Sequence, residues 1–416
     1  MNRKKFTMQK SRKYIMILRF LTTILFFGFI DVSSSETLTP TSPQIKRFEH
    51  GLIDKMKRGA ERGKLWSVED RLAAHEVPGV AVAIIKNAEI VWAKGYGTKL
   101  AGSDIKVNAD TVFSVGSVSK MINAALILRL VAEKKIDLDA DVNTYLRSWK
   151  VPENSYTKFK KVTLRRILSH TAGFSQHGFD DYLPGEPLPN VLDTLNGLDR
   201  AKNQPIVLIS IPGEEMHYSG GGVTVSQLLV QDVTGLSYND AAKKYVFKPL
   251  GMSRSTFVNP LPEGYGNVAR SHDEYGKPTA LPRGWEAMPE MAASGLWTNV
   301  IDISQFIIAL MRSLDSGAGF LPTQVAKDMM TRVENSWFGL GPKLNGNNDT
   351  RVFYHGGAND SYRAWVEGHP QNNSGIVIFT NGTDGHWVYK EMRKSAEDAF
   401  DWLVKSDGGF EEPILK

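Results

Sequence analysis

The order of the expected secondary structure constrains this chain more than any other feature: strand-like runs lie near both ends, with helical patterns between them. Near the start, β-rich runs at 80–85 and 89–93 flank a short turn at Lys86-Asn87, which predicts a hairpin. Three further strands are expected near the other end, at 351–355, 362–367 and 375–380. Strands from both ends of the chain are therefore expected to share one antiparallel sheet.

Helical patterns occupy most of the remaining sequence. Ser67 followed by Asp70 is typical of a helix start and predicts a helix to about Ala74. Apolar residues with helical spacing predict another helix, and they are Met121, Ala124, Ala125, Leu128 and Val131. Further helices are expected near 163–169, 224–234, 238–247, 302–314 and about 387–404. The predicted fold class is α+β, an antiparallel sheet flanked by helices with an all-helical lobe inserted, and a cleft between the two is a common place for a small-molecule site.

Composition and charge exclude several classes of protein. The chain has 416 residues, 42% of them hydrophobic and 23% charged, which is ordinary for a globular protein. It has no cysteine, which excludes thiolate chemistry and cysteine-ligated metals. The net charge is +5, but residues 1–35 hold seven Lys or Arg and one acid, so the remainder is close to neutral. Nucleic acid is therefore not an expected partner.

The N-terminus has the order of an export signal. A basic lead precedes the apolar stretch 15–30, and small residues follow at Ser33, Ser34 and Ser35. The unbroken apolar core, Phe20–Ile30, is shorter than the ~20 residues of a membrane-spanning helix. Residues 1–35 are predicted to be a signal peptide, which makes the protein periplasmic or secreted. The alternative is an uncleaved N-terminal anchor, which would be the chain's only membrane contact.

The segment 113–120 carries the strongest chemical signal. Ser117 and Lys120 are three residues apart at the start of the predicted helix, so their side chains share one helix face. A serine hydroxyl is a weak nucleophile that needs an adjacent base. A lysine is such a base only when burial and nearby positive charge lower its pKa. A Ser-x-x-Lys match alone is weak, because a solvated pair in a first helical turn also explains it.

The segments around this pair resemble the serine β-lactamase and penicillin-binding-protein superfamily, in the branch of class C β-lactamases, D,D-carboxypeptidases, D-aminopeptidases and related esterases. Six segments occur in the family's order besides the serine motif, and they are 167–174, Pro212-Gly213, 218–220, 249–252, 293–297 and 355–357. The resemblance covers residues 65–405. It implies a β-lactamase-related serine hydrolase domain there, after a lead-in at 36–64 and before a C-terminal tail at 406–416.

The family's second motif, Tyr-x-Asn, falls on Tyr218. The resemblance implies that this phenol works with Lys120 as general base and then as general acid. The asparagine position is Gly220, so the contacts that an asparagine makes must come from elsewhere. The run of glycines at 220–222 is expected to make this edge of the site open and flexible, while Gly220 still borders the substrate.

The family's third motif, Lys-Thr-Gly, is replaced by His355-Gly356-Gly357. A histidine is expected to be only partly protonated, so it donates a hydrogen bond but offers a weaker positive field than lysine. Neutral esters and amides are therefore favoured as substrates over molecules that must carry a carboxylate. The resemblance also implies that these residues contact substrate and that the N–H groups of Ser117 and Ala358 form the oxyanion hole.

The remaining candidates are expected to be structural. His170 is expected to fix a turn after a helix. The alternating acids Asp137, Asp139 and Asp141 lack the glycine and distal glutamate of a calcium loop, so a solvated loop before a strand is expected. The histidines have no ligand spacing, so neither a metal nor a cofactor is expected. Trp297 and Trp337 are candidates for a pocket wall.

These observations predict an exported serine hydrolase that acts on an ester or amide through an acyl-enzyme on Ser117. The substrate is expected to be a small molecule or a peptide, with β-lactams, D-amino-acid peptides and carboxylic esters left open. Two alternatives remain. The first is a catalytically inert relative that binds a ligand, because the second and third motifs are altered. The second is a membrane-anchored structural or interaction protein, which leaves the six segments unexplained.

Overall fold

A computed structural model describes residues 39, 41–54, 56–198, 200–279, 287–315, 319–333, 335–346 and 351–400. The described residues belong to one compact unit. The predicted signal peptide and the C-terminal tail lie outside the described residues. The part of the chain that is described contains no helix long and apolar enough to cross a membrane.

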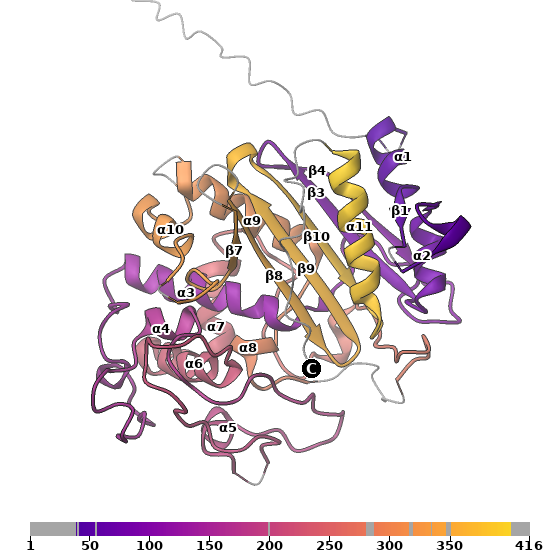
Figure 1. The fold of residues 1–416 in the computed structure, drawn as a ribbon. Helices are drawn as coiled ribbons and strands as arrows, with labels where there is room; N and C mark the ends of the chain where they lie inside the picture. The colour runs from indigo at the N-terminus through magenta and orange to yellow at the C-terminus, as the bar shows by residue number, and fades with distance from the viewer. Residues whose placement is uncertain are drawn as a thin grey trace, which may run out of the picture. The chain divides into compact units, whose positions relative to one another are not determined.

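The centre of the fold is a six-stranded antiparallel sheet in the order β4-β3-β10-β9-β8-β7. Its strands are β3 (Gly79–Lys86), β4 (Glu89–Gly97), β7 (Lys343–Asn345), β8 (Val352–Asn359), β9 (Tyr362–His369) and β10 (Ser374–Thr380). The pairing of β3 with β10 joins the two ends of the chain, with Val82 opposite Ile378. The predicted fold class is therefore confirmed (Figure 1).

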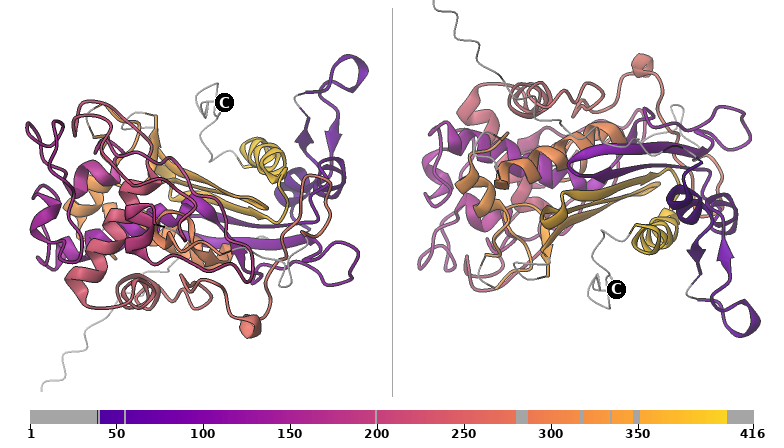
Figure 2. Two further views of the ribbon diagram at one scale, coloured as in Figure 1. Left: turned by 90° about the horizontal axis from the view of Figure 1, so that it is seen from below. Right: turned by 90° about the horizontal axis from the view of Figure 1, so that it is seen from above.

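Both faces of the sheet are covered, because successive side chains of a strand point to opposite faces. Along β3, Val80, Val82 and Ile84 belong to one apolar cluster, which includes residues of α11 (Gly385–Ala399). Ala81 and Ala83 belong to the other cluster, which extends through α9 (Val300–Asp315) into the helical lobe. Figure 2 shows the sheet between these two layers of helices.

The helical lobe carries the inserted middle of the chain. Its elements are α3 (Ser119–Ala132), α4 (Leu164–Leu168), α5 (Val191–Asn196), α6 (Gly220–Thr234), α7 (Tyr238–Ala242) with a π-turn at Lys243–Phe247, α8 (Met291–Ser294) and α10 (Thr323–Met329). Short 3₁₀ turns lie at Gly59–Glu61, Gly116–Val118, Val142–Thr144, Glu263–Tyr265 and Pro370–Asn372. Two short strands, β5 (Phe113–Ser114) and β6 (Trp297–Thr298), pair at the junction of lobe and sheet.

Most expected elements are present with shifted bounds. The Ser67–Asp70 capping box begins α2 (Val68–Ala74) as predicted. The lead-in is itself folded, because α1 (Pro43–Glu49) buries Phe48 against Trp92 and Phe400, and β1 (Leu52–Ile53) pairs with β2 (Leu65–Trp66). The acidic run 137–141 leads into a 3₁₀ turn and not into a strand, so that expectation was wrong.

Candidate active site

Ser117 lies in a 3₁₀ turn, Gly116–Val118, directly before α3. Gly116 has a positive φ of 50°, and a Cβ added there would lie 2.6 Å from the backbone nitrogen of Ala358. Ser119 secures the turn, since its hydroxyl donates to the Gly116 carbonyl at 2.6 Å and accepts from the Leu296 N–H at 3.0 Å. Glycine is thus required where strand β8 comes closest to the candidate nucleophile.

Lys120 is buried beside Ser117, as the spacing predicts. Its Nζ lies 3.1 Å from the Ser117 hydroxyl oxygen and donates to the Ala293 carbonyl at 2.8 Å. Burial lowers the pKa of Lys120 from 10.5 to about 7. An appreciable share of the amine is therefore uncharged at neutral pH, which is the state that a general base requires.

The ring of Tyr218 lies beside Lys120. The Lys120 Nζ lies 4.9 Å from the centre of the Tyr218 ring. The rings of His170, His177 and Phe338 surround the phenol, with centroids at 4.2, 4.8 and 5.8 Å. The structure therefore brings together all three predicted catalytic side chains, which come from separate parts of the sequence.

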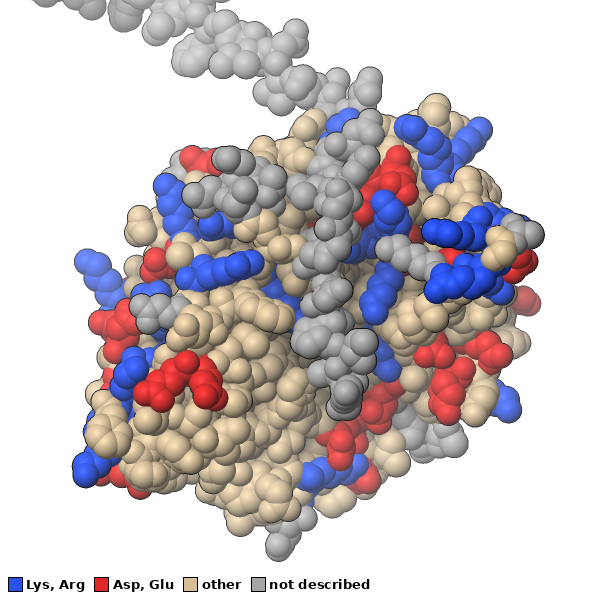
Figure 3. Space-filling model, in the orientation of Figure 1, with Lys and Arg blue, Asp and Glu red and all other residues tan. Residues whose placement is uncertain are grey.

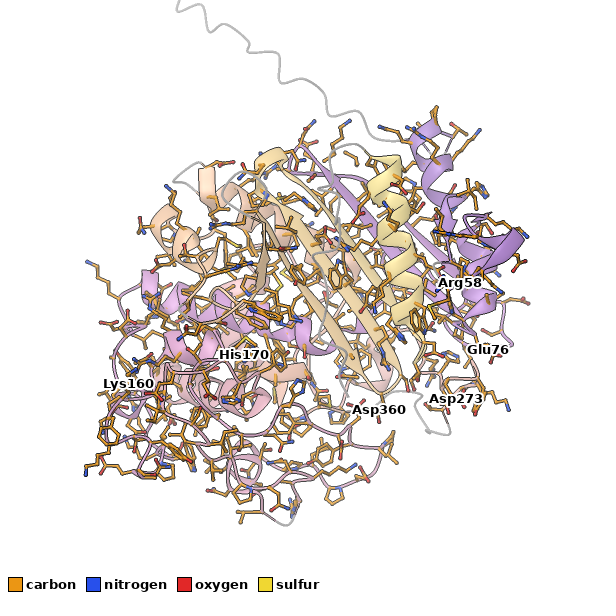
Figure 4. All side chains as sticks on the ribbon, in the orientation of Figure 1. Arg58, Glu76, Lys160, His170, Asp273 and Asp360 are labelled. Atoms are coloured by element: carbon orange, nitrogen blue, oxygen red, sulfur yellow. The ribbon has the colours of Figure 1, made fainter. Side chains whose placement is uncertain are left out.

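His170 holds the segment that carries Tyr218. It follows α4 in a left-handed conformation with φ 60°, and its Nδ1 accepts from the Ser219 N–H at 3.1 Å. Burial lowers the pKa of His170 well below its usual value, with Lys120 as the largest charge contribution. A neutral imidazole that accepts at Nδ1 carries its proton on Nε2. The expected turn is present, and through its bond to Ser219 it holds the segment that carries Tyr218. Figure 4 labels His170 in the helical lobe.

The glycine run at 220–222 is buried, so the prediction that it makes this edge of the site open was wrong. All three residues are buried in the first turn of α6. A Cβ added at Gly220 would lie 3.0 Å from the Phe179 ring and 3.1 Å from the His177 carbonyl oxygen. The glycines instead allow α6 to pack directly under the 174–179 loop, and a side chain at position 220 would require Phe179 or His177 to shift.

Strand β8 lies against the nucleophile turn. A Cβ on Gly357 would lie 1.9 Å from the Val115 carbonyl oxygen. Asn359 fastens the end of the strand by donating to the Ser114 hydroxyl at 2.7 Å. Within the described part of the chain, β7 pairs with β8 only from Val352 to Tyr354, so the outer edge beyond Tyr354 has no strand partner. The backbone of Ala358 is thus next to the Ser117 turn on an uncovered edge, where an oxyanion hole requires it.

His355 is uncharged, which corrects the expectation of partial protonation. It is 2% exposed. Burial, followed by the charges of Lys343 and Lys120, lowers the pKa of His355 to about 3. The third motif therefore supplies no fixed positive charge.

Ala358 also lies in the wall of a surface pocket. It has a volume of about 530 Å³ and is lined by residues of the lobe and of the β8–β9 hairpin, among them Phe179, Asp181, Asp273, Asn359, Asp360 and Arg363. Trp297 and Trp337 do not line it: Trp297 is buried in the core, and Trp337 is 53% exposed. No group of three or more His, Asp or Glu residues in the described ranges could hold a metal ion.

The sequence did not reveal three contributors to this site. They are the Ala293 carbonyl that fixes Lys120, the Phe338 ring beside Tyr218, and His177 against the same phenol. Ala293 lay within a segment noted for its family resemblance, but a carbonyl contact leaves no signal in residue type. His177 and Phe338 have no motif, since packing of distant segments brings them to the site.

An antiparallel sheet joined to a helical lobe, with a serine and a buried lysine at their junction, defines the serine β-lactamase and penicillin-binding-protein class. A family model described as Beta-lactamase matches residues 67–399, and the chain belongs to this family.

Two similar proteins have low sequence identity to this chain. Protein flp of Staphylococcus aureus strain MRSA252 is 24% identical over 326 residues, covering 76% of this chain and 61% of its own. Unguisins hydrolase ungD of Aspergillus violaceofuscus is 25% identical and covers 81% of this chain and 66% of its own length. The chain therefore spans less than two thirds of the length of these relatives.

Solved structures share the fold. The octameric penicillin-binding protein homologue of Pyrococcus abyssi superposes with a TM-score of 0.64 at 23% identity, covering 78% of this chain and 74% of that one. A D-stereospecific amidohydrolase from Streptomyces sp. superposes with a TM-score of 0.60 at 21% identity, covering 77% of this chain and 95% of that one.

Proposed function

We propose that this protein is a serine hydrolase that cleaves an ester or amide through an acyl-enzyme on Ser117. The observation that carries the proposal is the contact between the Lys120 Nζ and the Ser117 hydroxyl at 3.1 Å, made by a lysine whose pKa burial lowers to about 7. A nucleophile within hydrogen-bond reach of a base of suitable pKa is the arrangement that covalent catalysis needs.

In the proposed mechanism, neutral Lys120 takes the proton of Ser117 as the hydroxyl oxygen attacks the substrate carbonyl. The N–H groups of Ser117 and Ala358 stabilise the resulting oxyanion. The proton passes by way of Lys120 and Tyr218 to the leaving amine or alcohol as its bond to the acyl carbon breaks. Water then attacks the acyl carbon and gives a proton to the same groups. The bond between that carbon and the Ser117 oxygen breaks, the oxygen takes the proton back, and the acid is released.

The substrate is proposed to be a small molecule or a peptide, and no cofactor enters the mechanism. β-Lactams, D-amino-acid peptides and carboxylic esters all fit this chemistry, since the pocket and not the nucleophile selects among them. The name of one similar protein, a D-stereospecific amidohydrolase, supports amides as the first substrates to test.

A covalent probe tests the proposal and separates it from an inert ligand-binding protein. A fluorophosphonate or an activated ester should raise the intact mass by one acyl or phosphonyl group, and peptide mapping should place the group on Ser117. Ser117→Ala should abolish the shift, whereas Ser253→Ala, at an exposed position away from the nucleophile turn, should retain it. Absence of any mass shift, or an unchanged shift in Ser117→Ala, would leave the inert protein as the better account.

We also propose that residues 1–35 direct export. The support is their basic lead, apolar core and small residues before the polar segment. N-terminal sequencing of protein recovered outside the cytoplasm should begin near residue 36. A mature chain that still begins at residue 1 would indicate an N-terminal anchor instead.

A further inference from the structure

His355 holds a buried nitrogen that no described residue satisfies. Its Nε2 has no hydrogen-bond partner within the described ranges, and the residue is 2% exposed. An unpaired buried polar atom destabilises the fold, so such atoms are rare unless they have a functional role. The absence of a partner inside the protein points to a partner on a ligand.

The chemical character of this nitrogen follows from the other side of the ring. The His355 Nδ1 lies 2.6 Å from the Gly356 carbonyl oxygen, which can only accept. Nδ1 therefore carries the hydrogen, and in a neutral imidazole Nε2 is left with its lone pair. Burial and the charges of Lys343 and Lys120 keep the ring neutral, so Nε2 is an acceptor throughout the ordinary pH range.

The direction of the His355 side chain places its ring beside the leaving group of the substrate. His355 and Phe353 share one face of β8, and Phe353 belongs to the cluster that extends into the helical lobe. The ring centroid of His355 lies 6.3 Å from that of Tyr218 and 6.1 Å from that of Phe338. Because the leaving group must receive its proton from Tyr218 or Lys120, it departs on this side, whereas Ala358 lies about 10 Å further along the strand.

We propose that His355 determines specificity by accepting, at Nε2, a hydrogen bond from an N–H or O–H group on the leaving half of the substrate. A carboxylate at that point has no hydrogen to donate and meets the lone pair instead, so the site selects neutral leaving groups. This inference rests on the proposed function and names its substrate class.

The pocket beyond Ala358 gives independent support for an uncharged or cationic substrate. Among the described residues, its wall holds four carboxylates, Asp181, Asp273, Glu274 and Asp360, and one cation, Arg363. Asp273 and Asp360 are labelled at the lower end of the sheet in Figure 4, and acidic side chains gather near there in Figure 3. The half of the substrate that runs past Ala358 therefore also meets an excess of negative charge.

Lys343 offers the competing explanation, since its Nζ lies 5.9 Å from the centre of the Phe338 ring and its charge acts on His355. A carboxylate that reached this ammonium group would reverse the expected selectivity. The experiment must therefore distinguish His355 from Lys343.

The test uses two aryl esters of the same short neutral acyl group, whose leaving phenol carries either a carboxamide or a carboxylate at the same meta or para position. The rate of Ser117 acylation is measured by intact mass for each ester and divided by that ester's rate of hydrolysis in buffer alone. The wild-type protein should favour the carboxamide by at least tenfold, because a site built around a hydrogen bond strongly rejects an analogue that cannot make it.

Variants identify the residue responsible. His355→Gln adds an amide NH₂ that can donate to a carboxylate and should lower the preference, His355→Leu should bring the ratio close to one, and His355→Lys should favour the carboxylate. His50→Lys, at an exposed position after α1, is the control for added charge and should retain the wild-type ratio. If His355→Leu or His355→Lys does not fold, the wild-type protein and His355→Gln still decide.

Three results would overturn the inference. They are a wild-type ratio near one, a carboxamide preference that survives in His355→Leu, and a carboxylate preference that Lys343→Met abolishes. If neither ester nor a fluorophosphonate modifies Ser117, the proposed function itself fails; modification of Ser117 without the predicted selectivity refutes only the role of His355.

Discussion

Replacing Lys120 with methionine should destroy activity and yet stabilise the fold in a pH-dependent way. Burial lowers the pKa of Lys120 from 10.5 to about 7, so the folded protein loses this proton far more readily than the unfolded chain does. Between these two values the unfolded chain holds a proton that the folded chain lacks, and stability therefore rises with pH in this window. Burial of the amine lowers the free energy of unfolding of the wild-type protein, and the methionine variant has no such amine.

The magnitude follows from the two pKa values. A tenfold change in an equilibrium is worth about 1.4 kcal/mol, so the penalty is about 4 kcal/mol at pH 7 and about 2 kcal/mol at pH 9. The variant also leaves the Ala293 carbonyl without its donor, which costs about 1–3 kcal/mol at both pH values. The stability advantage of Lys120→Met should thus be about 2 kcal/mol greater at pH 7 than at pH 9.

Urea unfolding at the two pH values measures this difference. Lys248→Met removes an exposed lysine after the π-turn and should show the same change in unfolding free energy at pH 7 and pH 9. An equal effect of Lys120→Met at both pH values would refute the conclusion that burial depresses the pKa of this amine.

Three further substitutions test the geometry of the site. Tyr218→Phe should slow turnover by about 10²–10⁴ without unfolding the protein, and a near-normal rate would exclude the phenol as a proton carrier. Gly220→Asn should destabilise the fold by about 1–3 kcal/mol, because a Cβ there meets Phe179 at 3.0 Å, whereas Gly178→Asn, where an added Cβ meets nothing within 4 Å, should be tolerated; equal melting temperatures would contradict the packing described. Gly116→Ala should reduce the acylation rate of Ser117 by at least tenfold, since its Cβ would displace β8 at Ala358, and unchanged acylation would argue against an oxyanion hole at that contact.

Local sequence patterns predicted the architecture and the reactive pair. The β-rich runs near both ends and the Ser67–Asp70 pair are short-range signals. They predicted strands from both ends in one sheet and the start of α2, as observed. The spacing of Ser117 and Lys120 within one helical turn also fixes their proximity, so the contact between them could be expected before the fold was known.

Features that depend on contacts between distant segments were not predictable. Gly220 was expected to open the site, but the 174–179 loop packs onto it. His355 was expected to be partly charged, but burial and Lys343 make it neutral. Burial and tautomer depend on neighbours far away in the sequence, and neither is encoded in the residue type.

The pH dependence of Ser117 phosphonylation by a fluorophosphonate tests the central claim most directly, because the probe does not titrate and no substrate needs to be known. The phosphonylation rate should rise with pH and level off above an inflection near pH 7, where Lys120 loses its proton. A rate that shows no inflection near neutrality, or modification that proceeds at the wild-type rate in Lys120→Met, would contradict the account.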